Sequence, residues 1–109
     1  MTFDDYQEIA SQTAIYPDQG SNFVYPVLGL AGETGEVADK IKKIIRDQAG
    51  MIDNNGREEL KKELGDVLWY LSQLATELDL SLNEVAKANL HKIYSRLRRE
   101  RLSGAGDNR

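Results

Sequence analysis

The chain has no cysteine among its 109 residues. Disulfides, thiolate zinc sites and cysteine nucleophiles are therefore excluded. It also has no apolar run near the ~20 residues that a membrane-spanning helix needs. The opening residues Met1–Asp5 do not resemble a signal peptide. We therefore expect a cytoplasmic protein with no membrane partner.

Positive charge is in deficit, because 14 Lys and Arg face 18 Asp and Glu, for a net charge of −4. This balance argues against a nucleic-acid partner. A chain of this length forms one domain with a modest core, so we expect residues 1–109 to be a single domain. Such chains often gain stability by self-association, which predicts a homodimer or homotetramer. The end of the chain, from about residue 98 to 109, is predicted to be a flexible basic tail.

The chain is organised around a short acidic segment that occurs twice. Residues 30–37 read LAGETGEV and residues 60–67 read LKKELGDV. Two acids and one glycine recur at matching places: Glu33 with Glu63, Glu36 with Asp66, and Gly35 with Gly65. Duplication in the same phase favours a shared site over two unrelated solvated helix faces.

Both copies have the apolar spacing of an α-helix, at about 100° per residue. The apolar stripe of the first copy extends from Leu30 to Ile45, and that of the second from Leu60 to Leu78. The acids stand beside these stripes. A carboxylate near a core loses hydration and must be paired, protonated or bound to metal. We therefore expect two helices that pack by their stripes to gather four metal-binding acids.

Glycine inside a helix costs about 1 kcal/mol relative to alanine. Gly35 and Gly65 each stand between the two acids of a copy. We expect them to mark a level at which the two helices approach closely.

The predicted fold is all-α, a four-helix bundle-like protomer with an antiparallel central helix pair, completed by oligomerisation. Thr2 is expected to cap the first helix, and Ser81 with Glu84 forms a capping box for the fourth. The expected ranges are 3–13 for the first helix, about 22–46 for the second, 57–78 for the third and 82 onward for the fourth. Between the central helices, Asp53–Gly56 reads as a turn.

Four further side chains are candidates for ligand binding. Lys40 and Tyr70 each lie one turn after the second acid of a copy, and Asn89 and Lys92 occupy comparable positions on the fourth helix. Lys40 is a candidate for phosphate contact, against a solvated basic face. Tyr70 can contact a ligand or serve packing, and Asn89 and Lys92 can complement the acidic site or form ordinary hydrogen bonds and salt bridges.

Two more residues are expected to stand outside the site. Trp69 is expected to pack on another helix or subunit. His91, on the opposite face of the fourth helix, is expected to be exposed.

The candidate site is made of oxygen ligands, which suit Mg²⁺, or Mn²⁺, better than zinc or copper. Mg²⁺ is commonly shared between carboxylates and substrate phosphates, so the site fits phosphoanhydride hydrolysis. No P-loop GxxxxGK[ST] is present. A nucleotide would therefore be held by the metal and by helix side chains.

The pattern Glu33-x-x-Glu36 followed by Glu63-x-x-Asp66 resembles the ExxE…ExxD signature of the MazG-like, all-α nucleoside triphosphate pyrophosphohydrolases. The similarity covers roughly residues 22–92. It implies a dimeric or tetrameric helical bundle in which these four acids hold Mg²⁺. It also implies attack of water on a nucleoside triphosphate, giving the monophosphate and pyrophosphate.

The resemblance extends to other positions. Tyr70, Asn89 and Lys92 match nucleotide-contacting positions of relatives. Some relatives carry a glutamate suited to act as general base where this chain has Gly32. Glu33 or Glu36 is therefore the candidate for that catalytic role.

Three functions remain open at this point. The first is a housecleaning pyrophosphohydrolase that removes unwanted nucleotides. The second is a phosphoribosyl-ATP pyrophosphohydrolase, which shares the scaffold and the metal chemistry. The third is a non-catalytic helical dimerisation module whose acids bind metal structurally.

Overall fold

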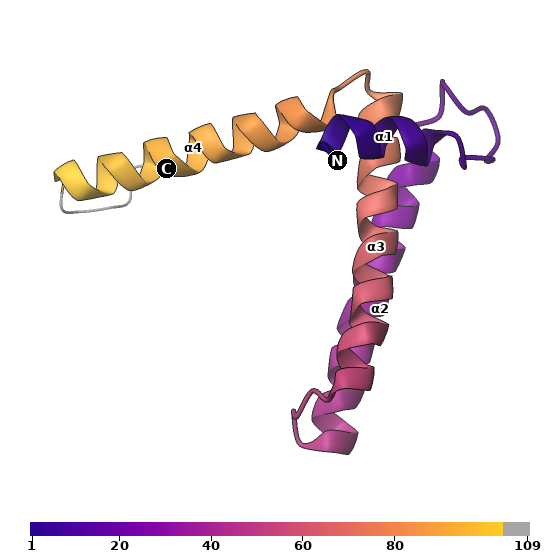
Figure 1. Ribbon diagram of the computed structural model, residues 1–109, viewed down its shortest axis with the longest axis vertical. Coiled ribbons are helices and arrows are strands. Elements are labelled where there is room, and N and C mark those ends of the chain that lie inside the picture. The colour runs from indigo at the N-terminus through magenta and orange to yellow at the C-terminus, as the bar shows by residue number, and fades with distance from the viewer. Residues whose placement is uncertain (104–109) are drawn as a thin grey trace.

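The computed structural model describes the backbone of residues 1–103 and the side chains of residues 1–101. Its four helices are α1 (Phe3–Ser11), α2 (Val24–Gln48), α3 (Asn54–Glu77) and α4 (Leu82–Ser103), shown in Figure 1. Residues 1–103 contain no β-strand. The prediction of an all-α fold is therefore confirmed.

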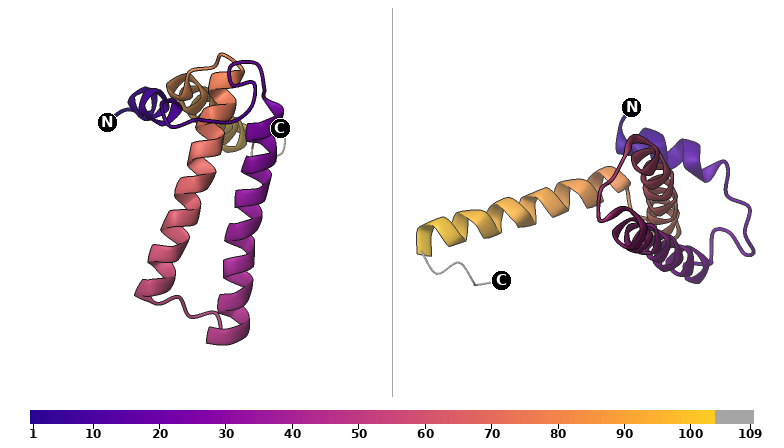
Figure 2. Two further views of the ribbon diagram at one scale, coloured as in Figure 1. Left: turned by 90° about the vertical axis from the view of Figure 1, so that its right-hand side faces the viewer. Right: turned by 90° about the horizontal axis from the view of Figure 1, so that it is seen from below.

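The two longest helices, α2 and α3, form the central unit. They run side by side in opposite directions and are joined at one end by a short loop (Figure 2). The antiparallel central pair is thus confirmed. This arrangement brings the middle of α2 against the middle of α3, which is where the two acidic copies lie.

The remaining helices meet the other end of this pair. α1 crosses the end of α3 and packs on both α3 and α4. α4 then projects sideways, away from the pair (Figure 1). α4 therefore does not lie along α2 and α3 as the fourth helix of a bundle would, but extends away from them as an arm. No helix in the described part of the chain is long and apolar enough to cross a membrane.

Local capping sets where the helices begin. Thr2 and Asp5 form a reciprocal capping box at α1, as the sequence predicted for Thr2. At α3, the side chain of Asp53 accepts a hydrogen bond from the Gly56 backbone N–H at 2.7 Å. Because this bond caps a helix, α3 begins at Asn54, and the expected turn at 53–56 is instead the first turn of the helix.

The ends of α2 and α4 also differ from expectation. α2 begins at Val24, and the Asn22 side chain accepts from the Tyr25 backbone N–H at 3.1 Å. Ser81 Oγ accepts from the Glu84 N–H at 3.2 Å, as expected for the start of α4. α4 continues to Ser103, so residues 98–103 of the predicted tail are helical. The rest of that tail, 104–109, lies outside the described residues.

The buried apolar core is small and sits where α1, α3 and the start of α4 meet. Its members are Ala10, Ala14, Tyr16, Ala75 and Leu82. The apolar stripe of α3 is only partly covered, since Leu64 leaves 56% of its surface exposed. The expectation that α2 and α3 pack by their apolar stripes is therefore met only in part.

Candidate metal centre

Three carboxylates converge in the middle of the helix pair. Glu33 comes from α2, and Glu63 and Asp66 come from α3. One oxygen from each lies within 4.8 Å of the others. Glu33 and Glu63 are half-buried and Asp66 is exposed. The acids predicted from the two copies thus meet from opposite helices, with one side open to solvent.

Their charges act on one another. Burial raises the pKa of the Glu33 carboxyl, and the negative charges of Asp66 and then Glu63 raise it further. Glu36 adds a smaller contribution in the same direction to the pKa of Glu33. Such mutual repulsion is relieved when a cation binds between the carboxylates. The electrostatics of this group therefore suit a cation.

Glu36 is the predicted acid that stands apart. It is exposed on α2, one turn after Glu33, and is not among the three acids whose oxygens converge. The structure therefore brings three of the four predicted acids together.

Lys40 lies at the edge of the acidic group. Its Nζ is 3.8 Å from an oxygen of Glu63 and 3.7 Å from one of Glu59, both on α3. The lysine is half-buried. It therefore places a positive charge beside the carboxylates.

Tyr70 fills the space on the other side of the acids. Its ring lies against the α2 backbone at Gly29, where an added Cβ would overlap the ring. Burial raises the pKa of the Tyr70 hydroxyl, and the nearby Tyr25 and Glu33 add to this. Gly29 thus permits a close contact between α2 and the Tyr70 ring of α3, and the sequence had not singled this glycine out.

The glycines inside the two acidic copies play no such role in this protomer. A Cβ built on Gly35 or on Gly65 would meet nothing within 4 Å. The expectation of close helix approach at these positions is wrong. The contact occurs at Gly29 because a large ring from α3, and not the α3 backbone, is what approaches α2.

The two candidates on α4 lie apart from the acids of their own protomer. Asn89 and Lys92 are exposed on the projecting arm, and Asn89 borders an apolar groove with Phe3 and Leu71. Trp69 donates from Nε1 to Thr13 Oγ1 at 2.9 Å, so it packs on the segment after α1. His91 is exposed, as expected.

Sequence reasoning missed how the N-terminal segment is attached. The Glu77 carboxylate, in the last turn of α3, accepts backbone hydrogen bonds from Gly20 and Asn22 at 2.9 Å each, and another from the Tyr16 hydroxyl. The signal available was spacing alone: Glu77 stands one heptad after Tyr70, on the same side of the helix. Nothing in the sequence says what that side meets.

The chain also matches a known protein family. A family model described as the MazG nucleotide pyrophosphohydrolase domain matches residues 26–99, which include both acidic copies. The chain belongs to this family.

A relative from Mycobacterium phage L5, named Gene 37 protein, is 48% identical over 114 residues and is aligned over 100% of each chain. The name of this relative states no activity. No solved structure matches the chain. As a MazG-family member, the chain carries an acidic cluster, Glu33, Glu63 and Asp66, that could hold a divalent cation.

Proposed function

We propose that this protein is a Mg²⁺-dependent nucleoside triphosphate pyrophosphohydrolase that removes unwanted nucleotides. The observation that carries the proposal is the convergence of Glu33, Glu63 and Asp66 within 4.8 Å in a MazG-family chain. The proposed reaction joins a water oxygen to the α-phosphorus and breaks the bond from that phosphorus to the bridging oxygen. Pyrophosphate leaves, and the monophosphate remains.

The residues present fit a hard divalent cation. All three converging ligands are carboxylates, and no thiol exists in the chain. Oxygen ligands select Mg²⁺ or Mn²⁺, and an exposed side leaves room for water and phosphate oxygens. Bound Mg²⁺ would supply charge neutralisation of the phosphates and a lowered pKa for water.

Other side chains of the protein are assigned to proton transfer, phosphate binding and nucleotide contact. We assign Glu36, exposed on α2 one turn after Glu33, to binding the same ion or to taking the proton of the attacking water. In the proposal Lys40, whose Nζ lies beside Glu63, binds phosphate oxygens. In the proposal Tyr70, whose ring lies against Gly29, contacts the nucleotide.

A second copy of the chain would complete the molecule. The accessible surface is 8062 Å². This is about 2,000 Å² more than the roughly 6,100 Å² expected for a compact folded chain of this mass. The radius of gyration is 17.6 Å, against about 13 Å for a compact domain of this length.

The excess surface is apolar where α4 projects. Leu90 and Ile93 expose about half of their surface, at 54% and 47%. A stable dimer buries about 800 Å² per partner, which this excess supplies. We therefore include homodimer or homotetramer formation in the proposal. In it, Asn89 and Lys92 on α4 serve the acidic site of a neighbouring copy.

The test is a screen of canonical and damaged nucleoside triphosphates with Mg²⁺, in which released pyrophosphate is measured. Turnover of nucleotides that needs Mg²⁺ is expected. If pyrophosphate is released from phosphoribosyl-ATP alone, phosphoribosyl-ATP replaces the proposed substrate class. If no triphosphate releases pyrophosphate, the remaining candidate function is a helical dimerisation module.

Glu63→Gln is the matched site variant, because it removes one charge and keeps the side-chain volume. Removing a metal-binding carboxylate should lower turnover on the order of 100-fold or more, with unchanged helical circular dichroism. Glu58→Gln is the control, because Glu58 is on the same helix, is exposed, and pairs with Lys61 and with no other described residue. Equal activity of the two variants would refute the assigned site.

A further inference from the structure

Glu77 ties the segment between α1 and α2 to the end of α3. Its Oε1 accepts from Asn22 N, and its Oε2 accepts from Gly20 N and from the Tyr16 hydroxyl. The Tyr16 hydrogen bond, followed by the two backbone bonds, lowers the pKa of Glu77. The acceptor is thus an ionised carboxylate, whose hydrogen bonds are stronger than neutral ones.

A column of three tyrosine rings, Tyr16, Tyr25 and Tyr70, connects Glu77 to the acidic group. Tyr16 stacks on Tyr25 with ring centres 4.7 Å apart and an interplanar angle of 9°. The Tyr25 ring centre is 6.5 Å from that of Tyr70. Tyr70 in turn rests on Gly29, one helical turn before Glu33. The column therefore extends from Glu77 to the edge of the acidic group.

The column and the lysine lie on opposite sides of the acids. Along α2 the order is Tyr25, Gly29, Glu33 and then Lys40, so the aromatic end and the cationic end are separated by the carboxylates. A nucleoside triphosphate has the same order of chemistry, with an aromatic base at one end and a chain of phosphates at the other. Tyr25 leaves 43% of its surface exposed, which gives a base a ring to stack on.

We propose that Tyr25 and Tyr70 form the nucleoside-facing wall of the acidic site, that the buried Tyr16 ring supports Tyr25 from behind, and that Glu77 is the positioning residue that sets this wall. The inference rests on the proposed function, because it assigns the two ends of the same substrate. Glu77 touches no substrate in this scheme. It acts through Tyr16, whose ring supports Tyr25.

Glu77→Gln tests the inference with little change in volume. A glutamine presents one acceptor oxygen and one NH₂ group, so it cannot accept from both Gly20 N and Asn22 N through separate oxygens. The KM for a nucleoside triphosphate is expected to rise about tenfold, with kcat within about twofold. Inhibition by inorganic tripolyphosphate, which has no base, is expected to be unchanged.

Tyr16→Phe is the second variant. It keeps the stacked ring and removes the hydroxyl that Glu77 accepts, so a smaller rise in KM is expected. It also keeps the inference testable if Glu77→Gln fails to fold. Near-ultraviolet circular dichroism of both variants reports the tyrosine stack without any substrate, and a weakened tyrosine signal is expected for Glu77→Gln.

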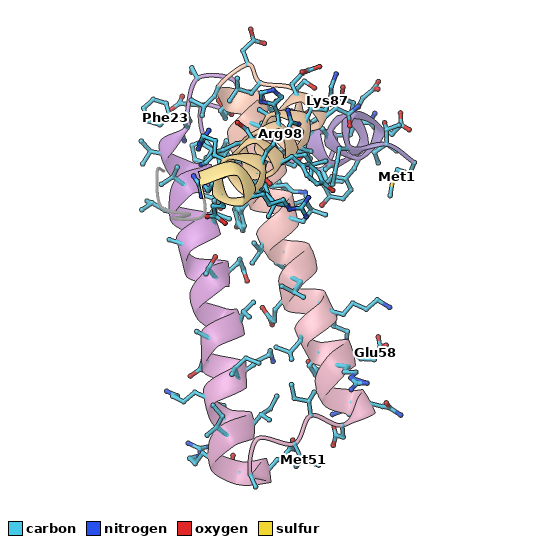
Figure 3. The ribbon with its side chains drawn as sticks, turned by 90° about the vertical axis from the view of Figure 1, so that its left-hand side faces the viewer. Met1, Phe23, Met51, Glu58, Lys87 and Arg98 are labelled. Carbon is cyan, nitrogen blue, oxygen red and sulfur yellow. The ribbon has the colours of Figure 1, made fainter. Side chains whose placement is uncertain are left out.

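The control is Glu58→Gln, near the other end of α3 (Figure 3). It should leave KM, tripolyphosphate inhibition and the tyrosine signal as they are in the wild type. If the wild-type protein turns over nucleotides and Glu77→Gln has the same KM, the inference is overturned and the proposed function still stands. Weaker binding of nucleotide and tripolyphosphate to the same degree would also overturn it. A wild-type protein without turnover would overturn both.

Discussion

The two acidic copies match in sequence but hold different places in the structure. In the α3 copy both acids, Glu63 and Asp66, join the converging group, whereas in the α2 copy only Glu33 does. The position one turn after the second acid also differs, being Lys40 in α2 and Tyr70 in α3. Because the helices are antiparallel, these equivalent positions lie on opposite sides of the acids.

The difference shows how a repeat can build an asymmetric site. Two identical copies on antiparallel helices would place the same residue at both ends of the acidic group. Here one end carries a cation and the other an aromatic ring. The substrate we propose has two unlike ends, so unequal copies suit it better than equal ones.

The largest expected effect separates the two acids of the α2 copy. Glu33→Gln should weaken Mg²⁺ binding on the order of 100-fold, while Glu36→Gln should weaken it about tenfold or less. The physical reason is that only Glu33 has an oxygen within the converging group. Isothermal titration calorimetry with Mg²⁺ measures both affinities. Equal losses would show that the two acids contribute alike when metal is bound.

The helical glycines give the next comparison. Gly29→Ala should lower the free energy of unfolding by about 2 kcal/mol, since the methyl group would overlap the Tyr70 ring. Gly65→Ala should raise it by about 1 kcal/mol, because open space surrounds that Cβ and alanine favours the helix. Urea denaturation at fixed protein concentration measures both. Destabilisation by Gly65→Ala would mean that another copy packs there.

The smallest effect concerns the cationic end. Lys40→Met removes the charge beside Glu63 and keeps the length of the aliphatic chain. Mg²⁺ affinity should rise a few-fold as a competing cation is lost, while nucleoside triphosphate affinity should fall about tenfold. Separate titrations with metal and with a non-hydrolysable triphosphate test the opposite signs. A fall in both affinities would assign Lys40 to supporting the acids.

Much of the site could be predicted because it depends on local spacing. Helical phase placed Glu33, Glu63 and Asp66 beside apolar stripes, and a short connection implied antiparallel helices. The separation of Glu36 could not be predicted, because it depends on the rotation of α2 about its own axis. That rotation is set by contacts such as Tyr70 on Gly29, which join residues far apart in the chain.

The helix ends also include one feature that the sequence predicted and one that it did not. The Thr2 capping box involves residues three apart and was predicted. Asp53 was predicted to start a turn and instead caps α3, because a capping aspartate and a turn aspartate have the same sequence signal. Continuation of the chain as helix decides between the two readings.

The amino-acid sequence by itself determined the four helices, the lack of thiol chemistry and the pairing of acids on two helical faces, since these depend on composition and on periods of a few residues. Tertiary structure alone decided which acids converge, which end of the site is aromatic, and that Glu77 holds the N-terminal segment. Those features depend on contacts between distant segments, and no local period encodes the relative rotation of two packed helices.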